Sequence, residues 1–150
     1  MSVSVNDCWD WAYARYTDPT LAASLGFDPA NVFKGDQLKI RAFPTLCIEP
    51  GPKRRNMYGA QRQMETRVTL LFIIYVGKVQ DPETNQAQAT TYGELIEADL
   101  HEHAQVGGNA IHSYVTELDP GYATRAGDVL RACRLTFDIE GQEILPMSAP

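Results

Sequence analysis

Apolar residues recur at every second position in four segments of the chain. This period predicts β-strands at about residues 39–49, 65–76, 110–118 and 129–140. The last segment alternates most regularly. Its inward side is expected to carry Cys133, Leu135, Phe137 and Ile139, and its outward side Arg134, Thr136, Asp138 and Glu140. In the first segment Pro44 indicates an edge, a bulge or a late strand start, because proline has no N–H for a ladder hydrogen bond.

The segment at residues 65–76 differs from the others because both of its sides are apolar. One side is formed by Val68, Leu70, Phe72, Ile74 and Val76. Leu71 and Ile73 make the centre of the other side apolar as well. Such a strand is typical of the interior of a sheet with both faces covered. We therefore expect this segment to be a central strand, covered on both faces for part of its length.

A helical period replaces the strand pattern at about residues 85–105. One stripe of this segment is formed by Ala89, Tyr92, Leu95, Ile96, Leu100 and Ala104. Two shorter helices are predicted before the first strand. One covers residues 7–16, with Asn6 or Asp7 as its N-cap, and the other covers residues 19–25.

These elements follow one another as helix, strand, strand, helix, strand, strand. The order predicts an α+β fold: a single, mostly antiparallel four-stranded sheet with a long helix packed on one face and a short N-terminal helical region. A chain of 150 residues fits one domain. Within it, residues 1–18 are expected to be an N-terminal extension and residues 142–150 a flexible tail.

Charge is distributed unevenly along the chain, whose formal net charge is −6. Residues 34–67 contain eight basic and three acidic residues, whereas residues 80–150 contain three basic and twelve acidic residues. Two regions of opposite sign suit a contact with another copy of the chain or with another protein. The alternative interpretation is a solvated surface without a partner.

Much of the positive charge lies in a predicted loop at residues 53–62, between the first two predicted strands. The interface candidates in this loop are Lys53, Arg54, Arg55, Met57, Tyr58 and Arg62. Arginine can bind a carboxylate through two parallel hydrogen bonds, and the second half of the chain supplies many carboxylates. The same loop could also follow a phosphate backbone, so nucleic-acid binding stays open as an alternative.

The sequence contains no motif for catalysis or cofactor binding. The patterns GxxxxGK[ST], GxGxxG and GxSxG are absent. His101 and His103 lie two residues apart on the predicted helix and therefore point about 200° apart, which argues against a shared metal ion. Cys47 and Cys133 are interpreted as small core residues. We expect no enzyme activity, no cofactor and no metal, and the apolar run at residues 70–76 is too short to cross a membrane.

Five stretches within residues 20–141 carry a resemblance to a known family. They read FPTLCIEPGPKRRN, TRVTLLFIIYVGK, YGELIEADLHEHA, HSYVTELDPG and LRACRLTFDIEG. In this order they resemble the tail-terminator and tail-completion (neck) proteins of long-tailed bacteriophages. The resemblance is one of strands and turns, and it includes no residue motif whose role can be carried over.

The resemblance implies a structural virion protein of the tail or neck, assembled in the host cytoplasm. Its subunits would form a homo-oligomeric ring, expected to be a hexamer, that caps the tail tube, stops tail polymerisation and joins the tail to the head. The implied partners are the tail-tube protein, a neck or connector protein and, as a further candidate, the sheath protein. Genomic DNA would pass through the lumen without sequence-specific binding, and no membrane is involved.

Three other functions stay open beside this one, and one of them is an enzyme of a type that the sequence does not reveal. The chain could be a different neck or head-completion adaptor of a phage. It could also be a small nucleic-acid-binding module that uses the basic loop at residues 53–62.

Overall fold

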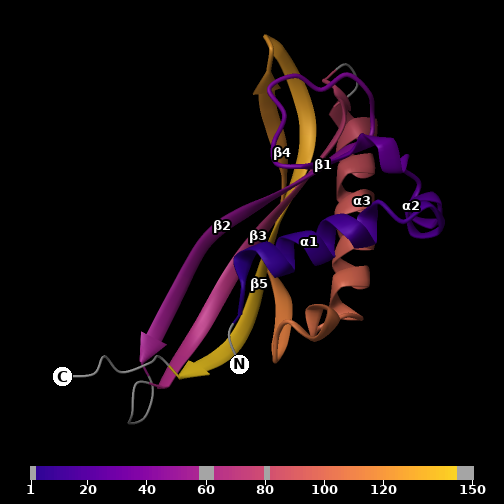
Figure 1. The fold of residues 1–150 in the computed structure, drawn as a ribbon. Helices are drawn as coiled ribbons and strands as arrows, with labels where there is room; N and C mark the ends of the chain where they lie inside the picture. Colours follow the sequence, from indigo (N-terminus) through magenta and orange to yellow (C-terminus); the bar gives the residue numbers. More distant parts are fainter. Residues whose placement is uncertain (1–2, 58–62, 80–81, 145–150) are drawn as a thin grey trace.

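The computed structural model describes residues 3–57, 63–79 and 82–144. Its α-helices are α1 (Val5–Tyr16), α2 (Pro19–Leu25) and α3 (Pro82–His101), and short 3-10 turns cover Pro29–Asn31 and Val106–Gly108. Its strands are β1 (Val32–Lys34), β2 (Thr45–Met57), β3 (Gln63–Lys78), β4 (His112–Arg125) and β5 (Asp128–Ile144). The strands form one sheet in the order β1-β2-β3-β5-β4. β1 and β2 are parallel, and the other neighbours are antiparallel (Figure 1).

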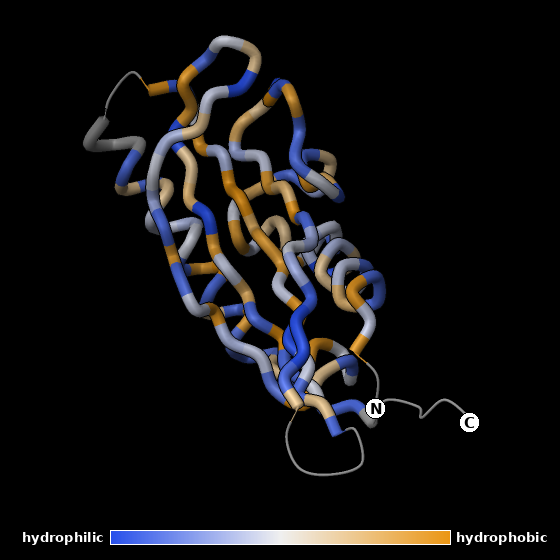
Figure 2. The backbone as a smooth tube through the Cα atoms, turned by 90° about the vertical axis from the view of Figure 1, so that its left-hand side faces the viewer, coloured by the Kyte–Doolittle hydropathy of each residue, from blue (hydrophilic) through white to orange (hydrophobic). Residues whose placement is uncertain are grey.

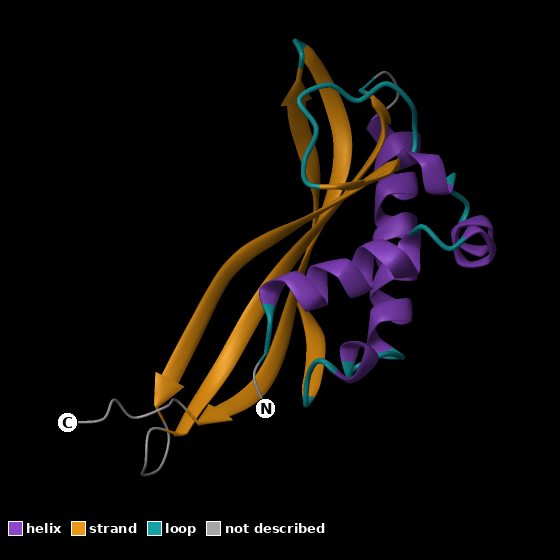
Figure 3. Ribbon diagram, viewed as in Figure 1, coloured by secondary structure: helices purple, strands orange, loops and turns teal. Residues whose placement is uncertain are grey.

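The helices gather on one face of the sheet (Figure 3). α1 contacts β1 and β2, α3 contacts β3, β4 and β5, and α2 contacts both of the other helices. The predicted α+β class is therefore confirmed. The described sheet has five strands and not four, because β1 was missed: three residues are too few to show an alternating pattern.

The main core lies between this face of the sheet and the helices. The strands contribute Leu46, Ile48, Val68, Leu70, Phe72, Ile74, Cys133, Leu135, Phe137 and Ile139, and the helices contribute Cys8, Ala12, Tyr16, Ala89, Ile96 and Leu100. Figure 2 shows hydrophobic residues along the middle strands. The predicted inward side of β5 is confirmed. Asp138 and Glu140 lie on the predicted outward side, where both are buried and accept hydrogen bonds from the neighbouring strand β3.

β3 is the central strand, as its two apolar sides predicted, because it pairs with β2 on one side and β5 on the other. Its second side carries Ile73 and Tyr75, which belong to a smaller core cluster on the face opposite the helices. Phe33, Ile40 and Phe43 pack against that cluster from β1 and the segment that connects β1 to β2. This cover ends before Leu71, which is only partly buried.

α1 is fixed to α3 by a cluster of polar bonds. The Arg15 guanidinium donates to both carboxylate oxygens of Asp99, at 2.7 and 2.5 Å, and the Tyr16 hydroxyl donates to the same carboxylate at 2.7 Å. Burial of Asp99 alone would raise its pKa, but the bonds from Arg15 and Tyr16 outweigh burial and hold the pKa below its ordinary value. The helix begins at Val5 with Ser4 as its N-cap, not with the predicted Asn6 or Asp7.

α3 ends at His101, four residues before the predicted end at residue 105. Leu95, expected on its buried stripe, is 41% exposed. Gly93 is buried instead. The helix lies so close to β5 at this position that a Cβ on residue 93 would be 2.6 Å from the Cys133 sulfur. The close approach of α3 to β5 at Gly93 rotates the helix so that Leu95 faces out.

The observed strand boundaries differ most from the predicted ones at strand ends where the hydrophobic pattern gives no clear limit. β2 starts at Thr45 and not at residue 39, and the Thr45 hydroxyl closes a turn by donating to the Ala42 carbonyl at 2.6 Å. β4 runs to Arg125 through residues 119–125, which were expected to be a loop. Polar residues continue a strand there because β5 supplies a partner along the whole length.

The basic segment is the most important correction. Residues 53–57 were predicted to be loop, but they continue β2 to Met57 and pair with β3. Of the predicted loop, residues 58–62 lie outside the described residues, and Tyr58 and Arg62 are among them. β5 continues to Ile144, so residues 142–144 of the predicted tail are strand, and residues 145–150 lie outside the described residues.

Candidate functional site on the projecting arm

Three strands extend past the helices and form an arm (Figures 1 and 3). The arm consists of residues 50–57 of β2, 63–68 of β3 and 139–144 of β5. It leaves the body of the molecule beyond α1 and on the side away from α3 (Figure 1). The chain therefore builds a long sheet that its own helices cover only in part.

Among the described residues, the outer edge of β2 has no neighbouring strand along the arm. β1 pairs only with residues 46–48. Pro50 and Pro52 lie on this open edge, and the register of β2 against β3 shifts between Pro50 and Lys53. Proline and bulges on an edge strand oppose pairing with a further strand. The arm is thus suited to contacts through its side chains.

On the helix side of the arm, the cations are internally bound. Lys53 and Arg55 lie 3.7 and 3.8 Å from the Glu143 carboxylate, which is largely buried. The Lys53 ammonium also donates to the Val3 carbonyl at 2.6 Å. Val3 is fully buried against Gly141, where a Cβ would lie only 2.1 Å from a Val3 methyl. Lys53 therefore braces the arm against the N-terminal segment, and Arg55 pairs with Glu143 within the arm.

On the opposite side, one row of side chains crosses the sheet. Arg54 of β2 stands directly opposite Arg67 of β3, Arg67 is opposite Glu140 of β5, and Glu140 is opposite His112 of β4. Glu140 accepts hydrogen bonds from Arg67 at 2.7 and 3.2 Å, and His112 lies 2.5 Å away. Tyr114 donates to the same carboxylate at 3.4 Å. Glu140 is thus saturated by its neighbours.

The electrostatics of this row follow from that geometry. Burial of Glu140 alone would raise its pKa, but the hydrogen bond from Arg67 and the charge of His112 outweigh burial and hold the pKa below its ordinary value. The bond to Glu140 raises the pKa of Arg67. Arg54 takes part in no ion pair within the described residues. It lines a shallow recess of about 340 Å³ together with Pro52, Arg67, Thr69, Leu71, Arg134, Thr136 and Asp138.

The predicted interface residues therefore separate into groups. Lys53 and Arg55 serve the arm itself, whereas Arg54 and Met57 face solvent, and the Met57 side chain is 70% exposed. The sequence did not reveal that Glu143 and Glu140 neutralise part of the basic segment. Those carboxylates lie far along the chain, and only the register of β3 against β5 brings them to the arm.

The other edge of the sheet carries the opposite charge. We define the acidic edge as Glu94, Leu95 and Glu97 of α3 with Glu117 and Asp119 of β4. α3 contains no lysine or arginine, and it packs closely on β4, since a Cβ at Gly93 would lie 3.3 Å from a Leu118 methyl. Burial raises the pKa of the Cys133 thiol to about 11, and the charges of Asp119, Glu97 and Glu94 add to that rise. The charges of these three carboxylates therefore act on the same buried thiol.

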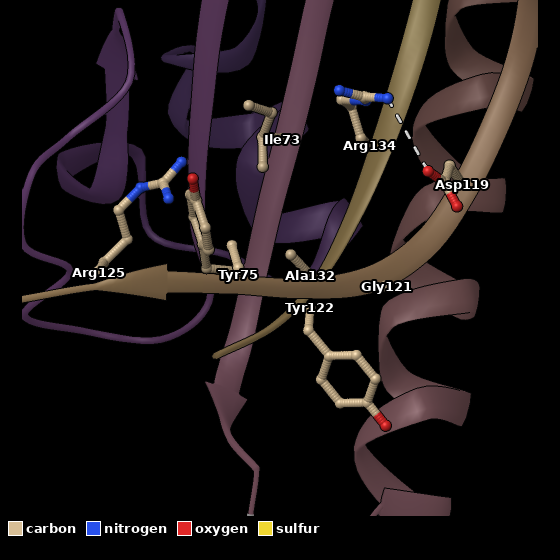
Figure 4. Close-up of a pocket in the computed structure, with 9 residues that line it drawn as sticks. Ile73, Tyr75, Asp119, Gly121, Tyr122, Arg125, Ala132 and Arg134 are labelled. Atoms are coloured by element: carbon tan, nitrogen blue, oxygen red, sulfur yellow. Dashed lines mark ion pairs between the residues drawn. The ribbon is translucent and has the colours of Figure 1, made fainter. Parts of the chain in front are cut away.

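A second recess, of about 340 Å³, lies on the uncovered face above the arm. Figure 4 shows Ile73 beside Tyr75, and Arg134 paired with Asp119 at 3.9 Å. Tyr75 donates to Asp36 at 2.7 Å, and Arg125 binds the same carboxylate. The charged and hydroxyl groups named around this recess are therefore already bound to partners. The recess is the open end of the smaller core.

The three cysteines and the cluster around Asp99 contain side chains that could be reactive, and the fold accounts for the surroundings of each. Cys8, Cys47 and Cys133 are fully buried, which confirms the prediction for the latter two, and burial raises their pKa values to about 11, 12 and 11. Asp99, Glu102 and His103 bring possible metal-binding atoms within 4.8 Å of one another. Both oxygens of Asp99 already accept hydrogen bonds from α1, which accounts for its position without a metal.

No protein-family model matches the chain, and no curated protein matches it. In the described part of the chain, none of the helices combines the length and the apolar character that a membrane crossing requires.

Proposed function

We propose that this protein is a structural subunit that assembles head to tail into a ring, expected to be hexameric. The ring caps a phage tail tube, ends tail polymerisation and joins the tail to the neck of the head. One observation carries the proposal: a projecting basic arm stands at one edge of the sheet, and acidic residues lie at the other edge.

A ring requires a contact in which two different patches of each subunit meet. The order β1-β2-β3-β5-β4 puts the open edge of β2 and the open edge of β4 on opposite sides of each subunit. Patches of opposite charge can be apposed without repulsion, and they set the register of the contact. The sequence resemblance to tail-terminator and tail-completion proteins supplies the biological setting, with the tail-tube protein and a neck protein as partners.

The proposal includes no reaction and no cofactor. It also makes DNA a passenger and not a specific ligand. Lys53 and Arg55 share Glu143, and Arg67 is bound to Glu140, so the arm presents fewer available cations than its sequence indicates. Because phosphate affinity grows with the number of cations that contact the backbone, this pairing disfavours a nucleic-acid-binding module.

The test is to delete the coding sequence from the phage that encodes the chain and to examine the particles by electron microscopy. We expect tails of uncontrolled length that are not joined to heads, with normal particles restored by the intact chain supplied in trans. Normal virions from the deletion would overturn the proposal. Native mass spectrometry of the purified protein, alone and on isolated tails, then measures the number of subunits in the ring.

A further inference from the structure

The face of the sheet opposite the helices carries a recess lined by Arg54, Arg67 and Arg134, which we name the arginine recess. Arg54 of β2 and Arg67 of β3 stand directly opposite each other, and Arg134 lines the recess from β5. Like charges at directly opposite positions on neighbouring strands are unfavourable. The fold therefore concentrates positive charge in one recess, although this arrangement lowers its own stability.

Most of the hydrogen-bond donors of these arginines are unused within the described residues. Arg54 takes part in no ion pair there. Arg67 binds Glu140 through Nε and Nη2, which leaves Nη1 for another acceptor. Arg134 lies 3.9 Å from Asp119, which is too far for a hydrogen bond. The arginine recess can thus donate several hydrogen bonds to an oxygen ligand that the described residues do not supply.

The charges around the arginine recess select the kind of oxygen ligand. Asp138 lines the recess and accepts a hydrogen bond from Thr69 at 2.7 Å, and Glu140 lies beside it, bound to Arg67. These two buried carboxylates repel a ligand of high negative charge. A carboxylate ligand brings one negative charge, whereas a phosphate monoester brings about −1.5 to −2 at pH 7. Because arginine also binds a carboxylate through two parallel hydrogen bonds, the recess suits a carboxylate.

The recess at the open end of the smaller core, which we name the apolar recess, has Arg134 as a lining residue in common with the arginine recess. It is lined by Ile73, Tyr75 and Ala132, which Figure 4 shows together. Leu71 lines the arginine recess and lies two positions before Ile73 on β3. Side chains two positions apart on an extended chain point the same way and are about 6.6 Å apart. A peptide in extended conformation can therefore place one side chain in each recess.

We propose that the two recesses bind an acidic segment of a partner protein. An aspartate or glutamate carboxylate of that segment is held by Arg54, Arg67 and Arg134, and an apolar side chain two positions away contacts Ile73 and Ala132. The carboxylate supplies the acceptor that the arginines lack, and the apolar side chain extends the smaller core. The inference does not depend on the ring of the proposed function, because the whole site lies within one subunit.

The first experiment titrates the full chain with end-blocked peptides and follows the Nε–H resonances of the arginines by NMR. The probes are Ala-Glu-Ala-Leu-Ala and the same peptide with glutamine in place of glutamate. We expect the glutamate peptide to give saturable shifts at Arg54, Arg67 and Arg134. Arg41, an exposed arginine that lines neither recess, should not shift. The glutamine peptide should bind about tenfold to a hundredfold more weakly. Absence of saturable shifts with the glutamate peptide would overturn the inference.

Variants then test the arginine recess directly. Arg54→Gln should weaken binding of the glutamate peptide by about tenfold or more, because it removes a charged donor from the recess. Arg41→Gln is the matched control, since it removes the same charge from an exposed site outside both recesses, and it should leave the affinity unchanged. Equal affinities of the two variants would show attraction by overall charge alone and would overturn the assigned site.

Changes in the probe test the rest of the assignment without altering the protein. A serine in place of the leucine should weaken binding by about tenfold, and an unchanged affinity would contradict the role of the apolar recess. A phosphoserine in place of the glutamate should weaken binding, and tighter binding would contradict the preference for a carboxylate. Displacement of the glutamate peptide by oligothymidylate at a lower concentration than by the peptide itself would assign the face to nucleic acid and overturn the inference.

The two proposals fail in different ways. If rings form and tails are terminated but the glutamate peptide does not bind, this inference is wrong while the proposed function stands. If the peptide binds as expected but phages without the protein make normal tails, the peptide site stands and the proposed function is wrong.

Discussion

Beneath the helices, the sheet presents apolar side chains that are fully buried, whereas the same strands continue into the arm with lysine, arginine and glutamate. In the body, Phe72 and Phe137 pack edge to face at a centroid distance of 5.9 Å. In the arm, Lys53 and Glu143 occupy the equivalent helix-facing side. Apolar burial supplies most of the stability of a fold, while a partly buried ion pair adds little net stability because desolvation offsets its attraction. The body therefore determines whether the chain folds, and the arm is available to determine what it contacts.

The largest expected effect breaks the body. Ile73→Asp should prevent soluble folding, because Ile73 is 8% exposed in the smaller core and an unpaired buried charge costs several kcal/mol. The measurement is the soluble yield and the thermal unfolding curve. Leu71→Asp is the matched control: it lies two positions away on the same side of β3, is partly exposed, and lines a recess with Arg54, Arg67 and Arg134. A soluble Ile73→Asp with unchanged melting would contradict the central position of β3.

The next effect concerns the bond between α1 and α3. Asp99→Asn should lower the free energy of unfolding by about 3–5 kcal/mol, because it leaves the Arg15 guanidinium without its carboxylate. The pKa of Asp99 is lowered in the folded state. The stability that Asp99 contributes is therefore fully present at a pH above its unfolded-state pKa of about 3.9. This stability is lost as the pH falls through the folded-state pKa. Denaturant unfolding at several pH values should show that loss in the native chain and a flatter profile in the variant. An unchanged profile would contradict the assignment to Asp99.

The junction of body and arm should show an intermediate effect. Gly141→Ala places a methyl group 2.1 Å from the present position of a Val3 methyl, so we expect a loss of about 1–3 kcal/mol from overpacking. Val3→Ala removes the obstructing methyl and should recover part of the loss when both changes are combined. A double-mutant cycle measured by denaturant unfolding gives the coupling between the two residues. Additive effects would show that Val3 does not pack on Gly141.

The same contrast explains how far the sequence could be interpreted. In the body, each strand face has one chemical character, so alternation correctly predicted the buried side of β5 and the central position of β3. Leu95 was misassigned because the rotation of α3 is set by the small size of Gly93 against Cys133, a contact that periodicity does not contain. The class of fold was predictable because it depends on the order of elements.

In residues 53–56 of the arm, alternation carries no burial signal because both sides are polar. The run Pro-Gly-Pro followed by Lys53, Arg54 and Arg55 therefore indicated a loop, although β3 and β5 hold it in a sheet. Arg54 and Met57 were identified from sequence as interface candidates, and they are exposed. That Arg54 alone among the three cations lacks an ion pair within the described residues depends on Glu140 and Glu143, whose positions only the strand register determines.

The smallest expected effect on stability tests the comparison between the body and the arm most directly. Arg54→Gln removes a positive charge that stands opposite Arg67. Like charges at directly opposite positions are unfavourable, so the variant should be more stable than the native chain by about 0.2–1 kcal/mol at low salt. Screening should reduce this gain as the ionic strength rises. Arg67→Gln is the matched comparison and should have the opposite sign, because it takes from the buried Glu140 its closest arginine. Denaturant unfolding at low and high salt measures both. If Arg54→Gln stabilises the subunit yet weakens binding of the glutamate peptide, Arg54 lowers the stability of the fold and serves the contact with a partner. If the variant destabilises the subunit, Arg54 belongs to the arm's own structure, and other residues make that contact.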